Sequence, residues 1–126
     1  NIGLIHSNDC VLGCWAQMNG ISTPKKPGVF NNIVFDHNNI DGTDNCGLLI
    51  AGGANVTVTN NTITNCCVSP TVPRGAYAIE IDASSQVTIT GNTVVKQKQA
   101  PGCKASMHMG QYQQASEVET SGNTGF

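Results

Sequence analysis

The sequence has little charge and few aromatic side chains. Charged residues make up 11% of its 126 residues, aromatic residues make up 5%, and the formal net charge is −2. Basic residues this few and scattered do not form the electrostatic footprint of a nucleic-acid-binding protein. The sequence contains no apolar run long enough to span a bilayer and no signal peptide. Heptads, amphipathic helices and glycine-rich phosphate loops are also missing, which argues against a helical bundle or a nucleotide-binding fold.

An internal repeat is the clearest feature that is present. Four stretches align, and in each of them apolar and polar residues alternate before an asparagine at a fixed offset. They are residues 33–40, 56–63, 87–94 and 118–125, which read IVFDHNNI, VTVTNNTI, VTITGNTV and VETSGNTG. The aligned asparagines are Asn38, Asn61, Asn92 and Asn123, and a fainter copy at residues 3–10 adds Asn8. Repeats with periods of roughly 20 to 50 residues indicate solenoids or arrays.

Each period is too short to bury its own apolar face, so stacked periods must share one core. The alternation indicates β-strands rather than helices. A second alternating segment precedes three of the copies and predicts inward-facing pairs, namely Leu48 with Ile50, Ile79 with Ile81, and Met107 with Met109. Asparagine suits the sharp turn between strands, and amides stacked about 4.8 Å apart can bond each other. We therefore predict one all-β domain over residues 1–126, a solenoid of about five rungs with an asparagine ladder.

The repeat, (I/V)-x-(I/V)-x-x-N-x-(I/V), resembles that of the right-handed parallel β-helices of the pectate-lyase-like superfamily. The resemblance covers nearly the whole chain and implies a right-handed parallel β-helix. It also implies a secreted, carbohydrate-active protein of the polysaccharide lyase, hydrolase or epimerase type. The clustered aspartates and the Gly-His-Gly and Arg-x-Lys segments of polygalacturonase-like members do not occur here. No catalytic residues can therefore be transferred from that family.

Candidate chemistry comes from the residues that alternate with the inward pairs. Glu80 and Asp82 should face outward, roughly 7 Å apart on one strand. The alignment of the next rung places His108 directly beside Glu80. Two carboxylates and a histidine could perform general acid and base catalysis on a polysaccharide, and Arg74 and Lys104 could neutralise a uronate carboxylate. The alternative is a structural Glu–His pair that stabilises neighbouring strands.

Six cysteines in so short a chain indicate an oxidising compartment, and hence a secreted, extracellular protein. They are Cys10, Cys14, Cys46, Cys66, Cys67 and Cys103, and we expect Cys10 in the inward column of Ile40, Ile63 and Val94. All 15 complete pairings remain open. A bridge between loops of adjacent rungs, such as Cys67 to Cys103, is one hypothesis. No Cys-x-x-Cys pair or Cys/His cluster has zinc spacing, so we predict no metal site, and no cofactor is indicated.

Two glycosylation sequons begin at Asn55 and Asn60, beside the second repeat. They fit secretion from a eukaryotic cell. The alternative is that Asn-x-Thr is simply a product of the repeat.

The chain begins inside one copy of the repeat and ends just after another. We expect either a piece of a longer β-helix or a subunit that stacks end to end with its copies. Two functions stay open at this point. One is the modification or binding of an extracellular polysaccharide, and the other is a structural or adhesive role in extracellular filaments.

Overall fold

The computed structural model describes residues 4–6, 10–13, 25–43, 46–68, 77–95 and 103–126, with the backbone alone for 4–6 and 10–13. These residues form twelve strands and one 3₁₀ helix. In chain order they are β1 (Leu4–His6), β2 (Cys10–Gly13), β3 (Phe30–Asp36), β4 (Asn39–Asp41), β5 (Leu48–Ala51), β6 (Gly53–Thr59), β7 (Thr62–Thr64), β8 (Tyr77–Asp82), β9 (Ser85–Thr90), β10 (Thr93–Val95), β11 (Ala105–Met109), η1 (Ala115–Glu117) and β12 (Val118–Ser121).

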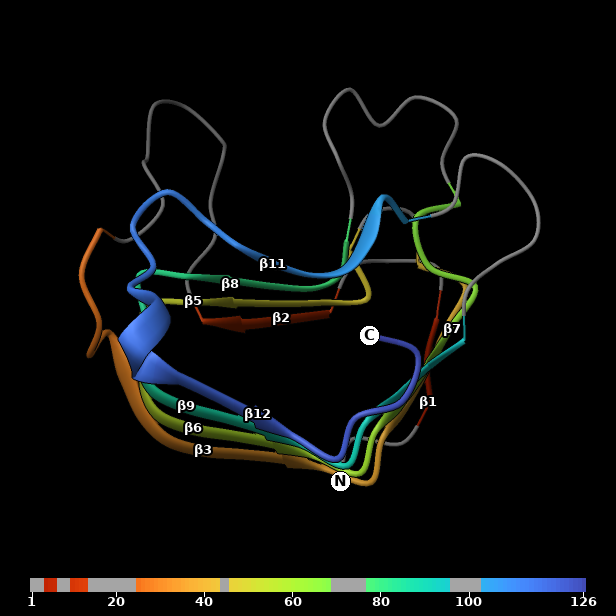
Figure 1. Ribbon diagram of the computed structural model, residues 1–126, viewed down its shortest axis with the longest axis horizontal. Coiled ribbons are helices and arrows are strands. Elements are labelled where there is room, and N and C mark those ends of the chain that lie inside the picture. The colour runs from red at the N-terminus through yellow and green to blue at the C-terminus, as the bar shows by residue number, and fades with distance from the viewer. Residues whose placement is uncertain (1–3, 7–9, 14–24, 44–45, 69–76, 96–102) are drawn as a thin grey trace.

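Within the described part of the chain, the strands form three sheets of four strands each. Sheet A has the order β1-β4-β7-β10, sheet B the order β2-β5-β8-β11, and sheet C the order β3-β6-β9-β12. All pairings between neighbouring strands in these sheets are parallel. Figure 1 looks along the stack, so that the strands of one sheet lie one behind another and the sheets enclose the interior. The predicted solenoid of β-strands is therefore confirmed.

The core consists of columns of aliphatic side chains that repeat from turn to turn. In sheet C, Val56 lies opposite Val87 and both are almost fully buried. In sheet B, Leu48 lies opposite Ile79, and both are completely buried. Met107 continues this column opposite Ile79 and packs against the core while remaining half-buried. The predicted inward positions of Leu48, Ile50, Ile79, Ile81 and Met107 are therefore correct, and the strand period of two explains them. Met109, opposite Ile81, is half-buried and is not part of the core cluster.

The corner between sheets C and A turns on one residue per rung in the left-handed conformation. His37, Asn60, Gly91 and Gly122 follow their sheet C strands directly and have φ angles of 51°, 55°, 65° and 61°. At Gly91 a Cβ would also lie 2.7 Å from Oδ1 of Asn60 on the preceding rung, so a larger residue there would have to displace the Asn60 amide. Asn and Gly recur at such corners because they tolerate this backbone conformation best.

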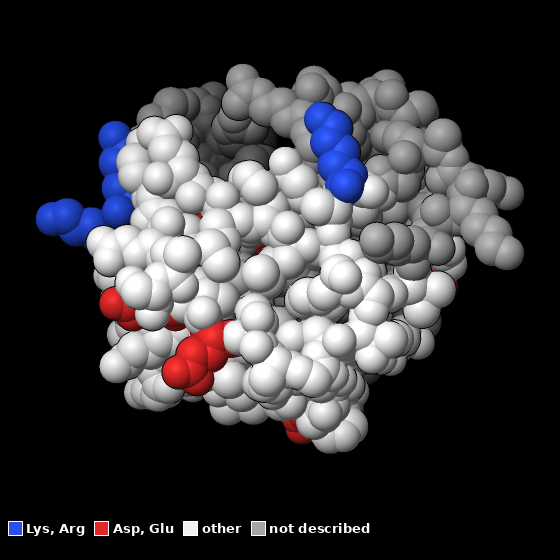
Figure 2. Space-filling view, viewed as in Figure 1, with Lys and Arg blue, Asp and Glu red and all other residues white. Residues whose placement is uncertain are grey.

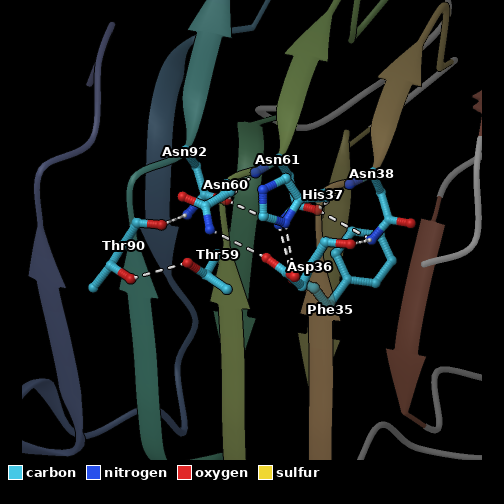
Figure 3. A network of polar contacts seen from close by, with 9 residues as sticks. All are labelled: Phe35, Asp36, His37, Asn38, Thr59, Asn60, Asn61, Thr90 and Asn92. Atoms are coloured by element: carbon cyan, nitrogen blue, oxygen red, sulfur yellow. Dashed lines mark hydrogen bonds and ion pairs between the residues drawn. The ribbon is translucent and has the colours of Figure 1, made fainter.

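An asparagine follows each of these corner residues, and the asparagines bond one another along the stack (Figure 3). The main-chain and side-chain nitrogens of Asn38 donate to Oδ1 of Asn61, at 2.8 and 3.1 Å. Asn61 donates in the same way to Asn92, at 2.9 Å for both bonds. Asn92 donates to Asn123, at 2.9 and 3.1 Å. Each buried amide therefore has partners on the neighbouring rungs, as a buried polar group requires.

The register of the first turn differs from the sequence alignment. Ile5 in β1 lies opposite Ile40, and Cys10 in β2 lies opposite Leu48. The prediction that Cys10 shares the column of Ile40 is therefore wrong. Asn8 lies outside the described residues, so its place among the stacked asparagines stays a prediction. A three-residue strand carries too little pattern to fix its register from sequence.

Candidate functional site

The outer face of sheet B carries the residues singled out for chemistry. On β8, Ile79 and Ile81 point into the core and are completely buried, so the strand alternation turns Glu80 outward. The pairing of β11 with β8 places His108 directly opposite Glu80, as predicted. The corresponding residue on β5 is Leu49, which is only 8% exposed although it lies on the outer face.

Glu80 and His108 form a loose carboxylate–imidazole pair. Nδ1 of His108 lies 3.7 Å from Oε1 of Glu80, and the two side chains are 41% and 28% exposed. This separation is longer than a hydrogen bond, and Nδ1 has no hydrogen-bond partner although it is shielded from water. The exposed part of the imidazole ring is therefore the part away from Nδ1. A protonated imidazole would attract the carboxylate, and either group could exchange a proton with a bound molecule.

Two side chains that the sequence analysis missed hold this pair. The ring of Tyr77 stacks on that of His108 with centroids 4.1 Å apart and planes 9° from parallel. The sulfur of Cys46 lies 3.2 Å from Oε2 of Glu80. Both residues lie at or before the start of a sheet B strand, outside the alternating positions that the sequence pattern marks. Tyr77 and Cys46 thus restrict the rotation of His108 and Glu80 respectively.

Asp82 has a structural place at the end of β8. Its Oδ1 accepts hydrogen bonds from the main-chain amides of Ala83, at 2.9 Å, and Tyr112, at 2.8 Å. Gly110 lies directly against the carboxyl group, where an added Cβ would overlap it. These bonds attach the loop that follows β11 to the end of β8. The two carboxylates expected to act together therefore differ in their surroundings. Glu80 is partly exposed, whereas Asp82 is hydrogen-bonded to main-chain amides.

Of the two basic residues predicted to contact a uronate, Lys104 lies among the described residues. Lys104 is exposed just before β11, four residues ahead of His108. Arg74 lies outside the described residues.

The predicted bridge between Cys67 and Cys103 is confirmed. The disulfide joins the segment after β7 to the segment before β11 across a sequence separation of 36 residues. Cys46 and Cys66 are buried. Cys14 and the side chain of Cys10 lie outside the described residues, so the pairing of these four cysteines stays open.

Both sequon asparagines have the left-handed backbone conformation and are exposed, Asn55 within β6 and Asn60 at the corner that follows it. Asn55 has a φ of 55° and donates from Nδ2 to Oδ1 of Asn32, at 2.8 Å. Asn60 also has a φ of 55° and donates to Oδ1 of Asp36, at 3.2 Å. Both are exposed, so glycosylation at these positions stays a prediction.

A second carboxylate–imidazole pair, which the sequence analysis did not identify, lies at the corner between sheets C and A (Figure 3). Nδ1 of His37 lies 2.7 Å from Oδ2 of Asp36. The hydrogen bond from His37 holds the pKa of Asp36 below its ordinary value, and the bond from Asn60 adds to this effect. Because this pair joins neighbouring residues at a corner and is well exposed, we assign it a structural role in the turn.

Among the residues that the structure describes, no three His, Cys, Asp or Glu side chains gather closely enough to hold a metal ion. No helix in the same residues has the length and apolar character needed to cross a membrane.

Three sheets of parallel strands, wound so that asparagines stack at one corner, define a parallel β-helix protein. The family model for the right-handed β-helix region matches residues 6–124, and the chain belongs to this family. No curated protein and no solved structure gave a match.

Proposed function

We propose that this protein is a secreted β-helix that binds and modifies an extracellular polysaccharide on the outer face of sheet B. The observation that supports this proposal is the Glu80–His108 pair, which the strand register brings together and which Tyr77 and Cys46 hold in place. A polysaccharide would lie across the strands, along the stack. The disulfide between Cys67 and Cys103 supports an oxidising, extracellular location.

The pair suits reactions in which one proton moves to or from a sugar. In a hydrolase, the acid form of Glu80 would protonate the glycosidic oxygen. In a lyase or an epimerase, its carboxylate would remove a ring proton beside the uronate carboxyl group. In both cases His108 would act as the second proton carrier or stabilise the charge on Glu80. Lys104 and Arg74 are proposed to contact the uronate, and Asp82 is proposed to position the loop beside the pair.

The experiment is an activity panel over acidic and neutral plant-type polysaccharides, followed by variants tested on the best substrate. Glu80→Gln should lower activity by a factor of about 10² to 10⁴, the usual contribution of a general acid or base. Asp36→Asn is the matched control, because it removes an exposed carboxylate from another corner of the solenoid. Full activity in the Glu80→Gln protein, or a wild-type protein inactive on every polysaccharide, would contradict the proposal.

Stacking of copies end to end is the second candidate function. Met107 and Val118, on the last described turn, are half-buried, whereas Ile79 and Val87 beneath them are 0% and 1% exposed. One more turn of β-strand would cover this edge of the core. Such a turn can come from the same protein or from a second copy, and the stacking role that we propose uses a second copy. Negative-stain microscopy and light scattering test this role, because filaments support it and a monodisperse monomer contradicts it.

A further inference from the structure

A groove with different chemistry lies at the corner where β6, β9 and β12 begin. It has a volume of about 410 Å³ and is separate from the Glu80–His108 pair, which lies on sheet B. Its lining residues are Asn55, Gln86, Val87, Thr88, Ser116, Glu117 and Glu119. Val56, Val87 and Val118 share one column of sheet C, so the residues that precede them, Asn55, Gln86 and Glu117, share the neighbouring column. The lining residues therefore come from successive turns. The groove therefore runs along the stack.

The polar groups of the groove are carboxylates, amides and hydroxyls. The main-chain amide of Gln86 donates to Oε2 of Glu117 at 3.0 Å, which fixes that carboxylate in the wall. Glu119 is exposed and lies opposite Thr88. Among the lining residues that the structure describes there is no lysine or arginine. Figure 2 shows the acidic atoms in the lower half of this view and the basic atoms in the upper half. The carboxylates of Glu117 and Glu119 therefore give this lining a negative potential.

The carboxylates, amides and hydroxyls of this lining favour some classes of ligand over others. Two carboxylates disfavour an anionic sugar, since like charges placed together are repelled. Calcium takes six to eight oxygen ligands, and the described residues provide no cluster of three metal-binding side chains. Amides and hydroxyls both donate and accept hydrogen bonds, as sugar hydroxyls do, and carboxylates prefer a positively charged donor.

We propose that the groove binds an oligosaccharide with protonated amino groups, of the glucosamine type. The sugar hydroxyls bond to Asn55, Gln86 and Thr88, and an ammonium group lies between Glu117 and Glu119. This site is independent of the proposed function, because it uses another sheet and the opposite ligand charge.

Titration calorimetry tests the proposal with three oligomers of equal length, made of glucosamine, N-acetylglucosamine or galacturonate. The protein should be produced without N-glycans, because Asn55 lines the groove. We expect the glucosamine oligomer to bind at least about tenfold more tightly than its acetylated form, a difference of about 1.4 kcal/mol. Added salt should weaken this binding.

Variants locate the site. Glu119→Gln should weaken binding of the glucosamine oligomer about tenfold. Asp36→Asn is the control, because it changes the net charge equally from outside the groove, and it should leave the affinity unchanged. Circular dichroism checks the fold of both proteins, and Thr88→Val serves as a second groove variant if Glu119→Gln is unfolded. Equal binding of the acetylated oligomer, equal weakening by both charge variants, or no binding at all overturns the proposal. Loss of polysaccharide modification in Glu80→Gln does not bear on it.

Discussion

Replacing Asn61 by alanine tests how far the stacked asparagines stabilise the solenoid. The side chain is 1% exposed and takes part in four hydrogen bonds. Its Oδ1 accepts two bonds from Asn38, and its Nδ2 donates to the carbonyl of Phe35 and to Oδ1 of Asn92. Alanine removes all four bonds.

The loss in the free energy of unfolding depends on which hydrogen bonds the former partners of Asn61 keep. Nδ2 of Asn38 still donates to the carbonyl of Asp36, and Oδ1 of Asn92 still accepts from the main chain of residue 61. The loss of a bond to such a partner costs roughly 1 kcal/mol. The main-chain amide of Asn38 and the carbonyl of Phe35 lose a buried bond, at roughly 1 to 3 kcal/mol each when no other partner replaces it. These costs sum to roughly 4 to 8 kcal/mol, and because neighbouring groups relax around a deleted side chain, we expect the free energy of unfolding to fall by an amount near the lower end, about 4 kcal/mol.

Equilibrium unfolding in urea measures this change, read at an unchanged m-value. Asn60→Gly is the matched control, because the neighbouring side chain is exposed and donates one bond to Asp36. Glycine also suits the positive φ of that position. The control should cost less than about 1 kcal/mol. A loss below about 1 kcal/mol in Asn61→Ala would refute the view that the asparagines stabilise the stack.

Three further predictions concern other parts of the molecule. Replacing Cys67 and Cys103 together by serine should lower the free energy of unfolding by about 3 to 4 kcal/mol, because the bridge joins residues with a sequence separation of 36. Equilibrium unfolding in urea measures this loss. The pKa of Asp36, read by NMR, should lie below 3.8 and rise in His37→Asn, so the stability from this pair is present above the unfolded pKa and is lost as pH falls through the folded pKa. An unchanged pKa in that variant would contradict the assigned cause. Gly47→Ala should lower the melting temperature or prevent folding, because its Cβ would lie 2.6 Å from a main-chain carbonyl oxygen in the core.

The fold could be predicted because the same pattern of apolar residues and asparagine occurs in several copies of the repeat. Val56, Val87 and the asparagines that follow each recur at one offset, so one alignment fixed the inward columns of sheet C. The register of Met107 opposite Ile79 followed from the same reasoning. In the first turn β1 has only three residues, Leu4–His6, and there the alignment was wrong at Cys10. Alternation along a strand specifies its register, so a strand this short specifies it weakly.

The site was predictable only where it shares the strand period. The sequence placed His108 beside Glu80 because both residues lie on paired strands, at positions that alternate with the core. Tyr77 and Cys46 were missed because Tyr77 is the first residue of β8 and Cys46 precedes β5, so both lie ahead of the alternating positions that the sequence pattern marks. The role of Asp82 was also missed, because its partners are main-chain amides that appear in no residue pattern.

The difference between inner and outer columns also separates stability from function in this chain. An inward position is constrained by both neighbouring turns, so a change at Ile79 must be matched by Leu48 and Met107. An outward position has no such requirement, and the column of Glu80 accordingly changes from Leu49 to a carboxylate and then to His108. Outer columns that keep one residue type, such as Thr57 with Thr88, fit a structural surface. Chemistry in a β-helix is therefore best sought where an outer column breaks its own repeat, as it does at Glu80 and again where Thr88 is followed by Glu119.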